Sequence, residues 1–364
     1  MTPARATAST SSTSSPDPVM LREASRHELS LIRFPERQTT WVVVMKVYLK
    51  DDPIDLDERL IALTGHVPLV GARLRGEEWW ADKPTPVLHT TGDPLLHPEA
   101  LREFDLDNEA PLRIILGENK ELALIAQHAA FDGLAMIALV RFLLGGPAPE
   151  PVTSAPAGPA DGMKPYLMRL ARPAHAVAPS VTVPSIETLV ARTTTIEGRQ
   201  TTGRMAAAFV AACVSHNARR GQPFKRVGIT IPIAGPVAGV GNVAGYRRID
   251  VSPNDSVVDA VVAAIKDNAE PQLQVRSTRY LKLTRPLVPR LSDSILASNL
   301  GGHPVEGAHR IDFYPVARGR SAVACGFTTV TGEQSTMTLR ARRLDRPDAQ
   351  RILDEAAERF EASN

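Results

Sequence analysis

Apolar residues in the first part of the chain fall into two patterns, continuous runs and repeats at helical spacing. The continuous runs predict buried strands over residues 41–50, 111–117 and 121–128. Turn-forming residues 117–120 join the last two strands as a hairpin, and residues 70–74 and 77–80 predict a second hairpin. Helical spacing predicts helices over residues 55–66, with Asp55 in the N-cap position, and 133–144, which is apolar almost all round.

The same two patterns recur in the second part of the chain. They predict helices over residues 204–221, 256–268 and 347–363. They predict strands over residues 226–233, 294–299, 310–316, 322–330 and 335–341. Neither part shows the regular strand–helix–strand alternation of a parallel nucleotide-binding sheet. We therefore expect an α+β protein made of two halves.

Segments of biased composition set the expected boundaries. Residues 1–19 are rich in Ser, Thr, Ala and Pro and predict a disordered leader. Residues 145–165 are dense in Pro, Gly and Ala. Such a segment buries little apolar surface, so we expect residues 147–180 to be a linker or crossover. It would separate an N-terminal half, 20–146, from a C-terminal half, 181–364.

Composition narrows the class of protein. With 43% hydrophobic and 23% charged residues in 364, the chain is typical of a folded globular protein. A net charge of +2 gives no field for nucleic acid or a membrane surface. The two cysteines, Cys213 and Cys325, exclude a disulfide framework or a Cys-based zinc site. No run reaches the roughly 18 apolar residues of a membrane span, and no secretory signal is present, so we expect a cytoplasmic protein without a metal site.

One short segment carries candidate chemistry, residues 127–133, where a predicted strand ends and a buried helix begins. His128 has an ordinary pKa near 6.5 and can accept a proton at neutral pH. Asp132 either orients this histidine or the loop, or caps the helix at Gly133, and Gly133 lets the backbone turn tightly. Taken alone, this spacing is also that of an ordinary histidine beside a helix cap. The glycines of residues 235–245 precede no helix and do not predict a dinucleotide site.

Residues 104–133 resemble the corresponding stretch of nonribosomal peptide condensation domains. There an acidic–hydrophobic turn leads to Pro-Leu-Arg, a hairpin and HHxxxDG; here Pro111-Leu112-Arg113 and His128…Asp132-Gly133 have the matching separation. Further pieces resemble the wider superfamily of chloramphenicol acetyltransferase-like acyltransferases, namely residues 66–74, 228–246 and 298–302. The first histidine of the motif is Gln127 here.

The resemblance implies two chloramphenicol acetyltransferase-like halves, with mixed sheets and flanking helices, forming a V around a central tunnel. His128 would be the catalytic base. Asp132 would be structural and would pair with an arginine, Arg73 first and Arg113 second. The Gly133 N–H and Asn299 would stabilise an oxyanion. The residues that the resemblance places near substrate are Asn299, Gly301 and Asn242, although Asn299 and Asn242 are also ordinary turn residues.

The implied activity is acyl transfer from a CoA or carrier-protein thioester to an alcohol or amine in nonribosomal peptide or polyketide biosynthesis. The partners would be a small-molecule acceptor and acyl-CoA or an acyl or peptidyl carrier protein, with no tightly bound cofactor. Gln127 leaves open a second reading, an inactive condensation-like domain that recruits a carrier protein or another enzyme. A third reading is an unrelated small-molecule-binding protein. A basic stretch over Arg276, Arg279, Lys282, Arg285 and Arg290 either faces solvent or meets the donor's phosphates or an acidic carrier.

Overall fold

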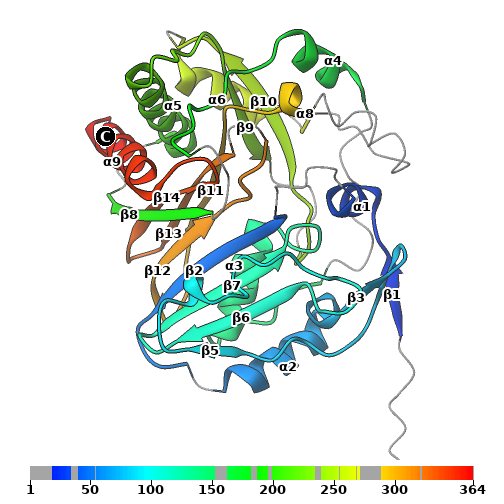
Figure 1. Ribbon diagram of the computed structural model, residues 1–364. Helices are drawn as coiled ribbons and strands as arrows, with labels where there is room; N and C mark the ends of the chain where they lie inside the picture. The colour runs from blue at the N-terminus through cyan, green and yellow to red at the C-terminus, as the bar shows by residue number, and fades with distance from the viewer. Residues whose placement is uncertain are drawn as a thin grey trace, which may run out of the picture.

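The computed structural model describes most of the chain (Figure 1). The described residues are 19–33, 40–53, 55–151, 162–181, 187–195, 199–233, 239–253, 255–267, 269–270, 288–319 and 322–363. The predicted leader lies outside them apart from Val19, and so does the predicted basic stretch apart from Arg290. The structure is α+β, with mixed sheets covered by helices, as the sequence predicts.

The first half is built on a five-stranded sheet. Its elements are β2 (Val42–Leu49), α2 (Leu56–His66), β5 (Leu88–Thr90), β6 (Leu112–Gly117), β7 (Glu121–Gln127), α3 (Gly133–Leu143) and β12 (Ala308–Tyr314). The strand order is β12-β2-β7-β6-β5. Only β5 and β6 run parallel. Strand β2 is buried along nearly its whole length because its apolar run has neighbours on both sides.

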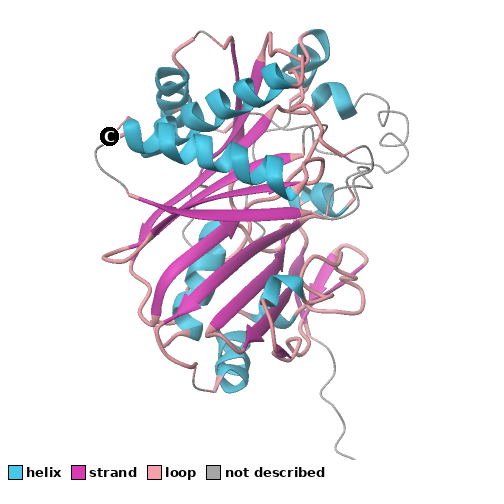
Figure 2. Cartoon of the chain, turned by 60° about the vertical axis from the view of Figure 1, so that its left-hand side comes forward, coloured by secondary structure: helices cyan, strands magenta, loops and turns pink. Residues whose placement is uncertain are grey.

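The second half is built on a six-stranded sheet. Its elements are β8 (Thr188–Thr194), α5 (Thr201–Arg219), β9 (Val227–Ile233), β10 (Gly245–Val251), α6 (Val257–Lys266), α8 (Val288–Leu291), β11 (Ile295–His303), β13 (Val323–Val330), β14 (Ser335–Ala341) and α9 (Arg346–Ala362). The strand order is β10-β9-β11-β13-β14-β8. Helices α5, α6 and α9 lie together along one side of this sheet (Figure 2), and their apolar faces form its core.

A small third sheet stands beside the first half. It joins β1 (Met20–Glu23), β3 (Arg73–Arg75) and β4 (Glu78–Trp80) in the order β1-β4-β3. The predicted hairpin of residues 70–74 and 77–80 is present here as β3 and β4, after a short 3-10 turn, Pro68–Gly71. A second such turn is Pro94–Leu96. Helix α1 (Arg26–Ile32) follows β1 and begins in a capping box of Ser25 and Glu28.

Most of the predicted elements are confirmed, and the differences have physical reasons. Asp55 is the N-cap residue of α2, but it adopts a left-handed backbone conformation and its side chain makes no capping hydrogen bond. Strands β1, β5, β8 and β10 are short or carry many polar residues, so the apolar pattern did not predict them. The expected linker contains helix α4 (Lys164–Ala171).

Strand β12 joins the two halves. It comes late in the sequence but pairs with β2 in the first sheet, over Tyr314↔Val44 to Ala308↔Leu49. Its Phe313 carbonyl accepts a hydrogen bond from the Thr338 hydroxyl of β14. It also lies so close to Gly326 of β13 that a side chain there would strike the Phe313 carbonyl oxygen. The division expected at residues 147–180 did not anticipate this crossing.

No helix in the described ranges is long and apolar enough to cross a membrane.

Candidate active site

A cavity of about 150 Å³ lies between the two sheets. The first half contributes the end of β2, the β7–α3 corner and α1; the second half contributes β9, β10 and β11. Strand β12 and the loop after it complete the wall. Of the sequence-predicted residues, the cavity is lined by His128, Asp132, Gly133 and Asn299. The expected site between the halves therefore exists as a hollow with His128 in its wall.

Hydrogen bonds from both halves hold His128 in place. Its backbone N–H donates to the Trp41 carbonyl at 2.7 Å, and its own carbonyl accepts from the Asn242 side-chain amide at 2.6 Å. The ring nitrogen Nδ1 lies 3.3 Å from the Phe131 carbonyl oxygen. A carbonyl can only accept, so Nδ1 carries the proton and Nε2 holds the free lone pair. The Trp41 ring stacks on the imidazole at 6.3 Å between centroids.

The surroundings keep this imidazole neutral. Burial lowers the pKa of His128 to about 4, and the charges of Arg318 and Arg340, and of His27 when it is protonated, act in the same direction. The hydrogen bond to Phe131 opposes them only in part. At neutral pH His128 is therefore an unprotonated base with a fixed tautomer, which is the state that proton abstraction from an acceptor needs.

Asp132 links the two halves through backbone donors. One carboxylate oxygen accepts from Ala135 N–H at 2.9 Å and caps helix α3. The other accepts from Val243 and Ala244 N–H, each at 3.2 Å, in the loop before β10. Burial raises the pKa of this carboxyl, although these backbone donors favour its charged form. Of the two roles left open by the sequence, helix capping is the one formed.

Because the two carboxylate oxygens of Asp132 have different partners, two variants at this position should differ in stability. Asp132→Ala removes the cap and leaves buried N–H groups of both halves without an acceptor, and should lower the free energy of unfolding by about 2–4 kcal/mol. Asp132→Asn keeps an acceptor for Ala135 but points an amide donor at Val243 and Ala244, so about half of that loss is expected. Urea denaturation followed by circular dichroism measures both. Equal losses would mean that the cap on α3 contributes nothing, and an Asp132→Asn protein as stable as the wild type would mean that the contact between the halves contributes nothing.

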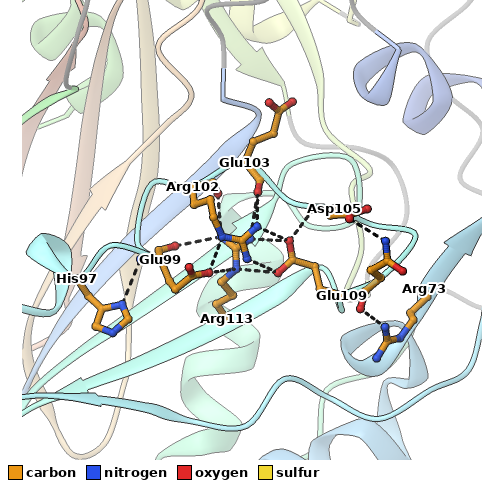
Figure 3. A network of polar contacts seen from close by, with 9 residues as sticks. Arg73, His97, Glu99, Arg102, Glu103, Asp105, Glu109 and Arg113 are labelled. Atoms are coloured by element: carbon orange, nitrogen blue, oxygen red, sulfur yellow. Dashed lines mark hydrogen bonds and ion pairs between the residues drawn. The ribbon is translucent and has the colours of Figure 1, made fainter.

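The predicted pairing of Asp132 with an arginine is wrong for both candidates (Figure 3). Arg73 forms an ion pair with Asp82 at 2.6 Å and donates to the Asn108 carbonyl. Arg113 is fully buried and pairs with Glu109 at 2.7 Å, with further bonds to the carbonyls of residues 99, 102 and 103. Arg113 thus anchors the turn before β6. Asp132 has its acceptor capacity filled by N–H groups instead.

Of the three residues expected near substrate, only one lines the cavity. Asn299 of β11 lines the cavity, donating to the Thr202 hydroxyl at 2.9 Å and accepting from Gly301 N–H. Gly301 does not line the cavity; it has a φ of +80°, which glycine adopts without strain. Asn242 is buried behind His128 rather than in the cavity wall. Asn242 therefore positions His128 through the His128 carbonyl, and Gly301 belongs to the irregularity between Asn299 and Gly302 where β11 pairs with β13.

Gly133 sits where the two halves are in close contact. A Cβ at this position would lie 2.6 Å from Leu300 of β11 and 2.9 Å from the Phe313 ring of β12. The sequence suggested a tight turn, whereas the structure requires glycine for this close approach. Among the described residues its N–H, the first of helix α3, has no hydrogen-bond acceptor, and Gly133 lines the cavity.

Sequence reasoning missed several residues of the cavity. Trp41, Tyr246 and Arg318 gave no local signal, because only the fold brings them to His128. His27 of α1 also lines the cavity. Helix α1 could have been found from its capping-box pattern, Ser25 followed three residues later by Glu28. Across the described ranges, no group of three His, Cys, Asp or Glu side chains is arranged to hold a metal ion.

Comparisons of sequence find no relative, since no protein-family model and no curated protein matches the chain. Solved structures do match. The starter condensation domain of rhizomide synthetase, solved with C8-CoA and Leu-SNAC, gives a TM-score of 0.61 at 9% identity, over 94% of each chain. The first condensation domain of the CDA synthetase gives 0.58 at 14% identity, over 94% of this chain and 96% of that one.

A protein associated with a polyketide synthase matches as well. Polyketide synthase associated protein 5 from Mycobacterium tuberculosis gives a TM-score of 0.55 at 15% identity, over 95% of this chain and all of that one. Sequence identities this low show a shared fold and nothing more. The chain has the two-half fold of these condensation domains and of polyketide synthase associated protein 5.

Proposed function

We propose that the protein is an acyltransferase that moves an acyl group from a thioester to an alcohol or amine acceptor, with His128 as general base. The observation that carries this proposal is the neutral His128 in the cavity between the halves, with Nδ1–H held by Phe131. Within the described part of the chain, Nε2 of His128 has no hydrogen-bond partner, so it can take the proton of an alcohol or amine substrate. The rhizomide synthetase domain, which shares the fold, was solved with an acyl-CoA, and this supports a thioester donor.

The proposed reaction needs one base and no covalent enzyme intermediate. The acceptor oxygen or nitrogen attacks the thioester carbonyl carbon while its proton passes to Nε2 of His128. The tetrahedral intermediate then collapses, the C–S bond breaks, and the same proton returns from Nε2 to the leaving thiolate. Holding donor and acceptor in line in one cavity supplies a large part of the rate.

The N-terminus of helix α3 is suited to the negative charge that forms on the thioester oxygen. The unbonded Gly133 N–H lies at the positive end of the helix dipole, in the same cavity wall as His128. Asn299 is a second candidate donor, since Thr202 engages only one of its two amide hydrogens. We therefore propose the Gly133 N–H as the first hydrogen-bond donor to the oxyanion and the Asn299 side-chain amide as the second.

Thiol release tests the proposal directly. The purified protein is incubated with a panel of acyl-CoAs and carrier-loaded acyl thioesters, with and without simple alcohols and amines, and free thiol is measured. Release that depends on the acceptor is expected for at least one donor. If no donor gives it, and the carrier-protein form binds without turnover, the protein is the inactive recruiting domain instead.

The pH dependence follows from the lowered pKa of His128. A general base must be neutral, so kcat/KM with an alcohol acceptor should stay level from pH 8 down to about 5 and fall only as pH approaches 4. Between pH 6.5 and 4 the unfolded chain binds more protons at this site than the folded one, so stability also falls as pH is lowered. Circular dichroism at each pH separates loss of activity from loss of folding. A kcat/KM profile with its midpoint near pH 6.5 in the folded protein would contradict a lowered pKa at the catalytic base.

A further inference from the structure

Arg318 places a positive charge inside the same cavity as His128. It follows β12 in the loop that closes the cavity, and its side chain is about 20% exposed. The next residue, Gly319, has a φ of +80°, and a Cβ there would lie 2.9 Å from Ser292. This close approach holds the loop against residues 292–293, so Arg318 is positioned by the fold.

Arg318 belongs to a compact polar cluster in the cavity wall. Its guanidinium lies 4.6 Å from the centre of the Tyr246 ring. The Tyr246 hydroxyl is 3.2 Å from that of Tyr166. Arg318 forms an ion pair with Asp293 at 3.6 Å. Asp293 also pairs with Arg248 at 3.3 Å and accepts a hydrogen bond from the Thr230 hydroxyl. Arg248 also pairs with a second carboxylate, that of Asp250.

Three titratable groups in the cavity respond to this charge. Burial lowers the pKa of His27 and of His128, and Arg318 lowers both further. Burial alone would raise the pKa of Tyr246, yet Arg318 and Arg169 lower it. Arg318 therefore acts on all three groups as a positive charge, although Asp293 lies close by.

The rest of the cavity wall contrasts with this charge. It is mostly apolar, with side chains such as Leu31, Val43, Ile233, Leu296 and Phe313. An anionic group that leaves water for such a wall loses solvation energy unless a cation meets it there, and Arg318 is a cation in this wall. A guanidinium forms paired hydrogen bonds with a planar carboxylate, and a cavity of about 150 Å³ takes a group the size of a benzene ring.

We infer that this cavity binds a substrate carboxylate at Arg318, with the Tyr246 hydroxyl as a second donor. The inference deepens the proposed function: the acceptor is a hydroxy or amino acid, or the acyl group bears a second, free carboxylate. In either case Arg318 holds the carboxylate while the reacting atoms lie at His128.

A binding experiment tests the site without relying on turnover. Benzoate and benzamide have the same shape and differ in charge, and saturation-transfer NMR measures the binding of each. Benzoate should bind the wild-type protein and benzamide should not compete with it. Arg318→Gln should weaken benzoate binding at least tenfold, Arg318→Lys should restore part of it, and the exposed Arg172→Gln serves as control. Equal binding of the two probes, or full binding by a folded Arg318→Gln protein, would overturn the inference.

Kinetics then identify the substrate that carries the carboxylate. Each acceptor is compared with its amide, each acyl-CoA with its ω-carboxy analogue, and CoA thioesters with phosphate-free N-acetylcysteamine thioesters. We expect Arg318→Gln to lower kcat/KM about a hundredfold for the carboxylate member of one pair only. A loss confined to CoA thioesters would make the anion a phosphate and refute the carboxylate. Charge-dependent benzoate binding without any thiol release would leave this site standing and remove the proposed function.

Discussion

Replacing His128 with alanine is expected to slow acceptor-dependent thiol release by about 10²–10⁴-fold, the usual contribution of a positioned general base. The imidazole is neutral and its tautomer is fixed by Phe131, so it is already in the reactive state before substrate binds. No carboxylate among the cavity-lining residues can take over its task, because Asp132 is occupied by three backbone donors. The loss should therefore fall on kcat.

The matched control for this variant is His89→Ala. His89 is exposed on β5 of the same sheet and does not line the cavity. Its replacement should leave the rate unchanged, and isothermal titration should give both variants the acyl-CoA affinity of the wild type. If His128→Ala keeps more than a tenth of the wild-type rate, the base lies elsewhere, and His27 becomes the next residue to replace.

The substitution at Gln127 does not weaken this expectation. Its side chain is buried and accepts from Ala129 N–H at 3.2 Å, and its carbonyl accepts from Ala130 and Phe131 N–H. It does not line the cavity. Gln127 therefore shapes the turn that carries His128, a task that a side-chain amide performs as well as an imidazole would.

Features encoded in short stretches of sequence could be predicted. The β6–β7 hairpin and helix α3 depend on contiguous apolar runs and on a turn between them, so the corner that carries His128 was found from the sequence. The cap at Asp132 was likewise one of two local roles proposed for it. These signals act over a few residues and need no knowledge of the rest of the fold.

Contacts between distant segments could not be predicted in the same way. Asp132 meets Val243, 111 residues away, and that contact uses a backbone N–H that any residue would supply. The resemblance instead implies an arginine partner, with Arg73 as the first candidate and Arg113 as the second, and both pair elsewhere. Strand β12 follows the pattern of any second-half strand, and nothing in its sequence indicates that it pairs with β2.

Arg340 of β14 joins the halves next to the cavity. It is fully buried and forms an ion pair with Glu187. It also donates to the Val42 carbonyl at 2.6 Å and to the Thr40 hydroxyl at 3.2 Å, on either side of Trp41. Trp41 in turn accepts from the His128 N–H and stacks on its ring. The ion pair therefore supports the position of the base from the opposite half of the protein.

Arg340→Met should lower the free energy of unfolding by about 3–5 kcal/mol, because it leaves the carboxylate of Glu187 buried without its cation. Removing both charges, as in Arg340→Met with Glu187→Leu, should cost clearly less, since no unpaired charge then remains. Urea denaturation gives both values, and Arg33→Met, which breaks the exposed pair with Glu77, should cost under about 1 kcal/mol. If the single variant is no worse than the double one, the pair does not hold the halves together, and the packing of β12 across both sheets must do so instead.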